Sequence, residues 1–165
     1  MRQEHSFVYD YGQVYLYDAA GVGSVDFLAA LEDSTRTGLS VGVADGLVDL
    51  LMPLQWNFSA ALSLEMLAGE PAPDLDEWEH MVEFALQLPS GRLLVEGSGG
   101  SGELEIEVPP GTYRARWAGR AFPPSGEYVP GDSSSDTYRL QLWATHEDEQ
   151  PRELKRWPGY DVLSG

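Results

Sequence analysis

Apolar and polar residues alternate along much of the chain, and this pattern predicts β-strands with one buried face. The clearest case is residues 104–117, where two alternating runs flank the sequence Pro-Pro-Gly at 109–111. Folded as an antiparallel hairpin, this segment has one apolar face and one face that pairs acids with bases. A shift of one residue would lose both patterns, so a single register is predicted. Its pairs are Val108 with Tyr113, Glu107 with Arg114, Ile106 with Ala115, Glu105 with Arg116 and Leu104 with Trp117.

A second hairpin is predicted near the start of the chain. Residues 6–9 and 14–17 are rich in aromatic and β-branched side chains, and they flank the turn-like sequence Asp-Tyr-Gly-Gln at 10–13. We therefore expect these two runs to pair as adjacent strands.

Residues 78–88 fit two patterns. Their alternation predicts a strand, whereas the spacing of Leu75, Trp78 and Val82 also suits a helix capped by Asp74. The sequence Pro-Ser-Gly at 89–91 favours the strand, because a helix would have to run into the proline. We expect a third hairpin, formed with the apolar run at 93–95.

From Leu50 to Met66 every even-numbered residue is apolar, which again predicts strand structure. This run is too long for one regular strand, so we expect a bend or bulge near residues 57–59. Pro53 indicates an edge position or a second irregularity.

Three further elements are predicted. A short helix through 26–31 would be capped by Ser24 and broken by residues 33–38. Residues 138–145 form a final strand that is apolar at even positions, and Trp157 is expected to pack back onto the body.

Short antiparallel strands without βαβ alternation predict a mainly β protein. We expect an antiparallel, jelly-roll-like β-sandwich with at most one or two short helices, and a single domain over residues 1–165.

Composition narrows the functional classes. The chain has 165 residues and no cysteine, which excludes disulfides, thiolate zinc sites and cysteine nucleophiles. The sequence begins without an apolar leader and has no apolar run long enough to cross a membrane, so a cytoplasmic location is expected.

The formal net charge is −17, which opposes direct binding to nucleic acid or to anionic membranes. Between Arg36 and Arg92 there is no lysine or arginine, and every charged residue there is acidic. This distribution predicts a surface of one sign, although high acidity can also serve solubility alone.

Candidate catalytic and metal sites are weak. His5, His80 and His146 lack the spacing of a metal site, and no serine–histidine–acid arrangement can be inferred from the sequence, so neither a metal nor a cofactor is expected. The glycine-rich loop at 96–103 has no nearby lysine, which argues against phosphate binding. Asp132 and Asp136 have the oxygen spacing of a calcium loop but lack its glycine and distal glutamate, so a solvated loop is the preferred interpretation.

Several stretches occur in an order that resembles one family. They are Ser6-Phe7-Val8-Tyr9, Gln13-Val14-Tyr15-Leu16, Ala44-Asp45-Gly46-Leu47-Val48, Pro110-Gly111-Thr112-Tyr113 up to Trp117, and Asp136-Thr137-Tyr138. Over roughly residues 6–145 the chain resembles the competence protein J family of bacterial nuclease inhibitors. The loops at 97–102 and 123–131 and the tail after 145 depart from that pattern.

The resemblance implies a protein that binds and inhibits a nuclease and needs no catalytic residues. The charge supplies a mechanism, because an acidic protein can occupy the basic nucleic-acid groove of such a partner. The expected partner-binding residues are Asp74, Asp76, Glu77, Glu79, Glu147, Asp148 and Glu149.

Two alternatives remain open. One is a carbohydrate- or small-ligand-binding β-sandwich that uses exposed aromatic residues and a loop calcium site at Asp132 and Asp136. The other is an enzyme, which would require a pocket with two carboxylates or a histidine of strongly shifted pKa.

Overall fold

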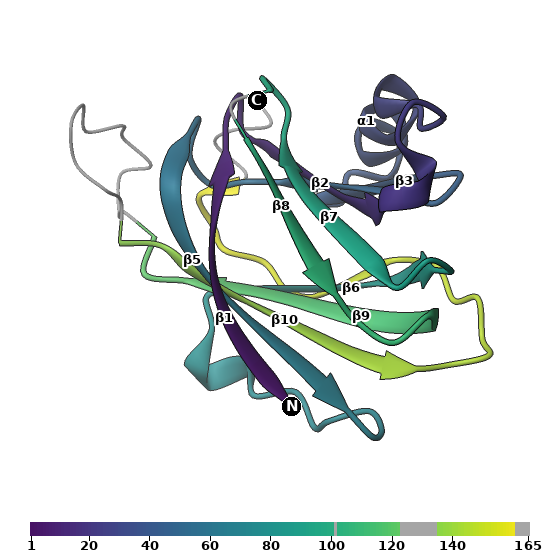
Figure 1. Cartoon of the computed structure of the whole chain (residues 1–165). Coiled ribbons are helices and arrows are strands. Elements are labelled where there is room, and N and C mark those ends of the chain that lie inside the picture. Colours follow the sequence, from purple (N-terminus) through teal and green to yellow (C-terminus); the bar gives the residue numbers. More distant parts are fainter. Residues whose placement is uncertain (101, 123–134, 161–165) are drawn as a thin grey trace.

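The structure is a computed structural model that describes residues 1–100, 102–122 and 135–160. Two β-sheets pack face to face, and one α-helix lies against the smaller sheet (Figure 1). This arrangement confirms the predicted mainly β, sandwich-like fold. The elements are β1 (Arg2–Tyr9), β2 (Gln13–Asp18), η1 (Ala19–Gly21), α1 (Phe27–Thr37), β3 (Val41–Ala44), β4 (Leu47–Leu51), β5 (Asn57–Leu67), η2 (Leu75–Glu77), β6 (His80–Leu88), β7 (Arg92–Gly97), β8 (Glu103–Glu107), β9 (Gly111–Arg120), β10 (Thr137–Ala144) and β11 (Arg152–Lys155).

The larger sheet has six strands in the order β1-β5-β10-β9-β6-β11, and the smaller has five in the order β3-β4-β2-β7-β8. Neighbouring strands are antiparallel except β5 and β10, which run parallel. Both sheets are open, and their edge strands are β1, β11, β3 and β8.

The core lies between the two sheets and is built from the alternating apolar positions that the sequence shows. Phe84 of β6 and Leu62 of β5 face Leu16 and Leu50 of the smaller sheet within one buried cluster. All four are at most 1% exposed, and burial of each such side chain contributes about 1.5–3 kcal/mol. An aromatic group formed by Phe7, Tyr9, Trp117 and Tyr138 fills one end of this core.

Helix α1 is longer than predicted. Asp26, rather than Ser24, caps it by accepting a hydrogen bond from the Ala29 amide at 3.0 Å, and Gly38 ends it in the left-handed conformation. Residues 33–37, which were predicted to break the helix, instead form its last turns, and only Gly38 ends it. Asp33 contributes by accepting a hydrogen bond from the Val43 amide of β3 at 3.0 Å.

The long alternating run from 50 to 66 is divided between the two sheets. The chain leaves β4 and passes through Pro53 before β5 begins, which confirms the predicted irregularity at the proline. Within β5 the register against β1 shifts, because Phe7 pairs with Ala60 and Tyr9 pairs with Asn57. The extra residue in β5 confirms the bulge predicted near residues 57–59.

The three predicted hairpins are wrong. Strands β1 and β2 are joined only by an isolated bridge between Asp10 and Gln13, and they belong to different sheets. The turn at 89–91 likewise takes the chain from β6 in the larger sheet to β7 in the smaller one. Each of these short turns crosses between sheets, and both flanking strands still point their apolar side chains into the shared core.

The segment 104–117 gives the largest correction. Strand β8 pairs with β7, whereas β9 lies between β10 and β6, so the predicted register between β8 and β9 does not exist. The apolar faces were identified correctly, since Ile106, Ala115 and Trp117 are all buried. The acid and base partners were not, because Arg114 and Arg116 contact Glu83 of β6.

Other predictions are confirmed. Residues 80–88 form strand β6, so the helical alternative is excluded, and β10 covers the predicted final strand. Trp157 is buried and packs edge-on against Phe122 with ring centres 5.0 Å apart. Among the described residues, no helix is long and apolar enough to span a lipid bilayer.

Candidate functional site

The first predicted acidic cluster lies in the connection between β5 and β6, around η2. Asp74 forms a bidentate ion pair with Arg139 of β10, with both N–O distances at 2.6 Å. The hydrogen bonds from Arg139 lower the pKa of Asp74 below its ordinary value. Asp74 therefore anchors the segment to the sheet instead of offering a free carboxylate.

The remaining acids of this cluster differ in exposure. Asp76 and Glu77 are exposed, whereas Glu79 is half-buried and its Oε1 accepts a hydrogen bond from the Phe122 amide at 3.2 Å. Asp76 and Glu77 are thus the two side chains of this cluster that face solvent most openly.

Trp78 fixes the segment next to these acids. Its ring contacts two guanidinium groups, with Arg120 at 4.4 Å and Arg139 at 4.7 Å from the ring centre. Cation–π contacts of this kind contribute about 0.5–2 kcal/mol each. They help to fix the positions of Trp78 and of the two arginines, of which Arg139 is buried and Arg120 is exposed.

The second predicted cluster, Glu147, Asp148 and Glu149, follows β10 and is exposed throughout. Its backbone is held by Arg114, which donates to the carbonyl oxygens of Glu149 at 2.9 Å and Gln150 at 3.1 Å.

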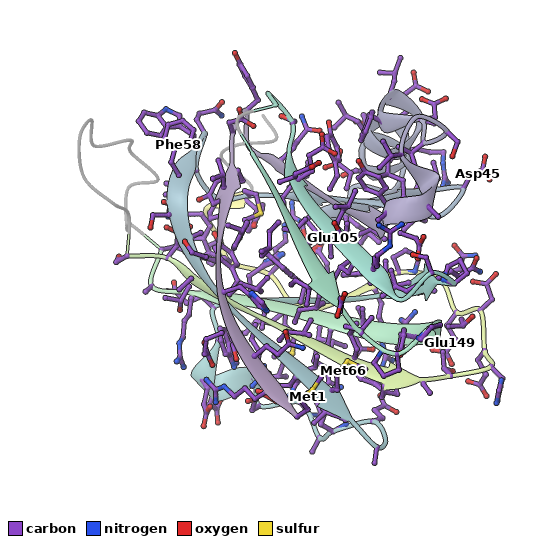
Figure 2. All side chains as sticks on the ribbon, viewed as in Figure 1. Met1, Asp45, Phe58, Met66, Glu105 and Glu149 are labelled. Carbon is purple, nitrogen blue, oxygen red and sulfur yellow. The ribbon has the colours of Figure 1, made fainter. Side chains whose placement is uncertain are left out.

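A pocket of about 430 Å³ opens between this segment and the turn that joins β3 to β4. Asp148 and Glu149 line one side and Asp45 lines the other, and Figure 2 shows Asp45 and Glu149 on the same side of the molecule. No lysine or arginine is present among the described residues that line it.

The structure does not bring the two predicted clusters together. The η2 cluster lies near the start of β10, through Arg139, whereas the second cluster follows its end (Figure 1). The part of β10 from Arg139 to Ala144, its last residue, is roughly 17 Å long.

Acids outside the predicted set also reach the surface. Glu103, Glu105 and Glu107 are exposed along the edge strand β8, and the sequence analysis had paired two of them with arginines of β9. Asp45 at the β3–β4 turn was likewise missed as a candidate. The Glu-x-Glu-x-Glu spacing puts the β8 acids on one face of a strand, but the sequence does not show that their arginine neighbour is Arg92 of β7, which lies 3.1 Å from Glu105, and not an arginine of β9.

Two arginine side chains on the outer face of the larger sheet are buried, whereas Arg120 and Arg152 are exposed. Arg116 is 1% exposed and Arg114 is 5% exposed, and both approach the fully buried carboxylate of Glu83. The Arg116 guanidinium also donates to the carbonyl oxygen of Pro71 at 2.9 Å. The charges of Arg114 and Arg116 are therefore turned inward.

A buried serine–histidine pair was the feature that could have indicated an enzyme. Ser40 Oγ lies 2.6 Å from His80 Nε2, and the Trp157 amide donates to His80 Nδ1 at 3.1 Å. Since Nδ1 accepts, the ring proton sits on Nε2 and points at Ser40, so the ring has no free nitrogen to take the serine proton. Burial, assisted by the charge of Arg156, lowers the pKa of His80 to about 3, which makes the imidazole a very weak base.

The described structure places Asp136 inside the core. It accepts hydrogen bonds from Tyr9 at 2.6 Å, Tyr138 at 2.5 Å and Asn57 at 2.8 Å. Its carboxylate is therefore already occupied, which argues against a calcium ligand, and Asp132 lies outside the described residues. Within the described part of the chain, no group of three or more histidine or acidic residues has the arrangement of a metal site.

A second pocket, of about 480 Å³, lies between the end of α1, the β1–β2 turn and the C-terminal segment. Among the described residues that line it there is no carboxylate, and Arg156 is the charged one. Tyr11 and Tyr160 contribute aromatic rings to this pocket.

Comparison with known proteins identifies the fold. No protein-family model matches the chain, and no curated protein sequence matches it. Among solved structures, the chain is similar to ComJ from Bacillus subtilis, described as an inhibitor of the DNA-degrading activity of NucA, with a TM-score of 0.56 and 18% identity over 88% of this chain and 96% of that one. It is also similar to the protein of crocagin biosynthetic gene J, with a TM-score of 0.56 and 14% identity over 88% of this chain and 98% of that one. At these identities the likeness establishes a shared fold, and it confirms at that level the resemblance drawn from the sequence.

Proposed function

We propose that this chain is a binding protein that inhibits a nuclease stoichiometrically, by placing acidic surface over the basic groove that holds nucleic acid. The observation that carries this proposal is the likeness to ComJ over 88% of the chain. Its partner is a basic protein, and the mechanism requires neither a catalytic residue nor a cofactor.

The distribution of charge supports the proposal. Arg114, Arg116 and Arg139 are turned inward against Glu83, Asp74 and backbone carbonyl groups. The exposed acids therefore face solvent with little compensation from these arginines. A surface of this kind accelerates association with a basic partner, and salt weakens the effect because the charges are exposed.

We further propose a division of roles among the predicted contact residues. We assign direct contact to Asp76 and Glu77 in the first cluster and to Asp148 and Glu149 in the second. Asp74 supports the first cluster through its ion pair with Arg139, and Glu79 supports it through the Phe122 amide.

The test begins with the immobilised chain and a lysate of its native host at low salt. Material eluted by rising salt is assayed for DNA degradation, and the recovered nuclease is titrated with the free chain. We expect activity to fall to zero at a one-to-one ratio. Failure to retain or inhibit any DNA-degrading activity would overturn the proposal.

Charge-neutralising variants then locate the contact. Asp76→Asn with Glu77→Gln, and separately Asp148→Asn with Glu149→Gln, should each weaken binding about tenfold and reduce its salt dependence. The matched control is Glu103→Gln with Glu107→Gln, which removes the same charge from β8 and should change affinity much less. Equal effects from all three pairs would show that net charge, and not these two clusters, determines affinity.

The pocket beside α1 favours a second candidate, the small-ligand-binding module. Its volume of about 480 Å³ is in the range of ligand sites, and its described lining is free of carboxylates in a very acidic chain. Under this alternative an uncharged sugar or aromatic compound from a library would raise the melting temperature. Arg156→Ala or Tyr160→Phe would abolish that shift without affecting nuclease inhibition.

A further inference from the structure

Glu83 lies in the middle of β6, on the outer face of the larger sheet, and is 0% exposed. One carboxylate oxygen accepts a hydrogen bond from Arg116 Nε at 2.8 Å. The other accepts from Arg152 Nε at 2.9 Å and lies 3.8 Å from Arg114 Nε. A single buried carboxylate is thus the shared partner of three guanidinium groups.

Arg116 and Arg114 continue outward to the backbone of different acidic segments, and Arg152 also lies 3.8 Å from the Glu70 carboxylate. Arg116 reaches residues 68–79, where it donates to the Pro71 carbonyl at 2.9 Å and lies 3.8 Å from the Glu70 carboxylate. Arg114 reaches residues 146–151, where it donates to the carbonyl oxygens of Glu149 and Gln150. The contacts to the backbone fix where each segment runs over the sheet.

We propose that Glu83 is a positioning residue that holds both acidic segments in place through these two arginines. A buried guanidinium needs a counter-charge, and Glu83 supplies one to Arg114 and to Arg116 at the same time. Without it, each arginine turns toward water and the exposed carboxylates, and it releases the carbonyl groups that it now holds. The two segments are therefore coupled through β6, although they are far apart in the sequence.

The proposal predicts different effects for the hub and for its branches. Loss of the Glu83 charge should loosen both segments. Replacing one arginine by lysine keeps a positive charge beside Glu83 but removes the planar fork that spans the carboxylate and the backbone carbonyl. Arg116→Lys should therefore loosen only residues 68–79, and Arg114→Lys only residues 146–151.

The experiment is limited proteolysis of the free, full-length chain with a glutamyl endopeptidase, with cleavage sites identified by mass spectrometry. Acidic residues in both segments provide sites, and cleavage reports local opening. Glu83→Gln should raise the initial cleavage rate about tenfold in both segments, as expected for the loss of hydrogen bonds to a charged group. Each lysine variant should do so in one segment, and Glu105→Gln, a control on β8, in neither.

Acceleration in only one segment by Glu83→Gln, or in both by a single lysine variant, would overturn the proposal. If Glu83→Gln fails to fold, the two lysine variants decide, because opening in both segments or in neither is incompatible with separate branches.

The consequence for binding rests on the proposed function. With the recovered nuclease, Glu83→Gln should leave the association rate unchanged and raise the dissociation rate about tenfold, and an unchanged dissociation rate would overturn this consequence. Failure to recover a nuclease would overturn the proposed function, while the proteolysis result would still decide the role of Glu83.

Discussion

The outer face of the six-stranded sheet is covered by two irregular acidic segments held through arginines, whereas the outer face of the five-stranded sheet is covered near β3 and β4 by helix α1. The helix packs through apolar side chains, with Ala30 and Phe27 against Tyr15, Tyr17 and Leu47. Each face also contains one fully buried carboxylate, Glu83 in the larger sheet and Asp49 in the smaller.

These two carboxylates show what the difference means. Glu83 is surrounded by arginines, while neither oxygen of Asp49 has a hydrogen-bond partner among the described residues. Burial without a partner raises the pKa of Asp49 to about 7. The arginines that hold the backbone of the acidic segments also stabilise the buried Glu83 carboxylate. The apolar side chains of α1 provide no such partner for Asp49.

The largest expected effect comes from removing the paired carboxylate. Glu83→Ala should lower the free energy of unfolding by about 3–5 kcal/mol, because it leaves Arg116 and Arg114 buried without their counter-charge. Urea denaturation followed by tryptophan fluorescence measures this change. A loss below about 1 kcal/mol would mean that the arginines find equivalent partners in the acidic segments.

The unpaired carboxylate should behave oppositely. The pKa of Asp49 is raised in the folded chain, so protons bind its carboxyl more tightly there than in the unfolded chain. Its contribution to the free energy of unfolding is therefore fully present below about pH 4 and is lost as the pH rises to about 7. Asp49→Asn should therefore become progressively more stable than the parent across this window, by up to about 4 kcal/mol.

Urea denaturation of both proteins at several pH values tests this prediction. The difference between them is the relevant quantity, because His80 contributes a slope of opposite sign. With its pKa lowered to about 3, His80 stabilises the fold increasingly as the pH rises from about 3 to 6.5. Parallel stability curves for parent and variant would contradict a raised Asp49 pKa.

A methyl group should distinguish the two covers by packing alone. A Cβ atom on Gly42 would lie 1.9 Å from the Ala30 carbonyl oxygen, whereas one on Gly69, next to the acidic segment, would meet nothing within 4 Å. Gly42→Ala should cost about 1–3 kcal/mol by pushing α1 from the sheet, and Gly69→Ala should be close to neutral. Thermal denaturation of both variants gives the comparison, and equal melting temperatures would show that α1 shifts without cost.

The smallest effect is expected at an exposed ion pair. Arg92 and Glu105 lie 3.1 Å apart on the smaller sheet, with their side chains 49% and 45% exposed. Glu105→Gln should change the free energy of unfolding by less than about 0.5 kcal/mol, because water and salt screen the pair. A loss comparable with that of Glu83→Ala would remove the distinction between buried and exposed carboxylates.

For the candidate site, the sequence was sufficient to identify the acidic segments but not the role of each acid. Asp74 and Asp76 are two residues apart in the same acidic stretch, yet one forms a bidentate ion pair with Arg139 and the other is exposed. The partner of Asp74 is 65 residues away along the chain. Only the folded arrangement could show this, since ion pairing depends on distance in space and not on local composition.

For the fold, alternation in the sequence identified most of the strands and the buried side of each, although β3 and β11 were not predicted. Phe84, Leu64 and Ile106 all lie in the core as their positions predicted. Alternation could not determine the sheet to which each strand belongs, because a short turn can join strands within one sheet or across the core. Either connection buries the same apolar face. Tertiary packing determines the sheet to which each strand belongs. As a result, Arg114 and Arg116 contact Glu83, and the acids of β8 are exposed to solvent.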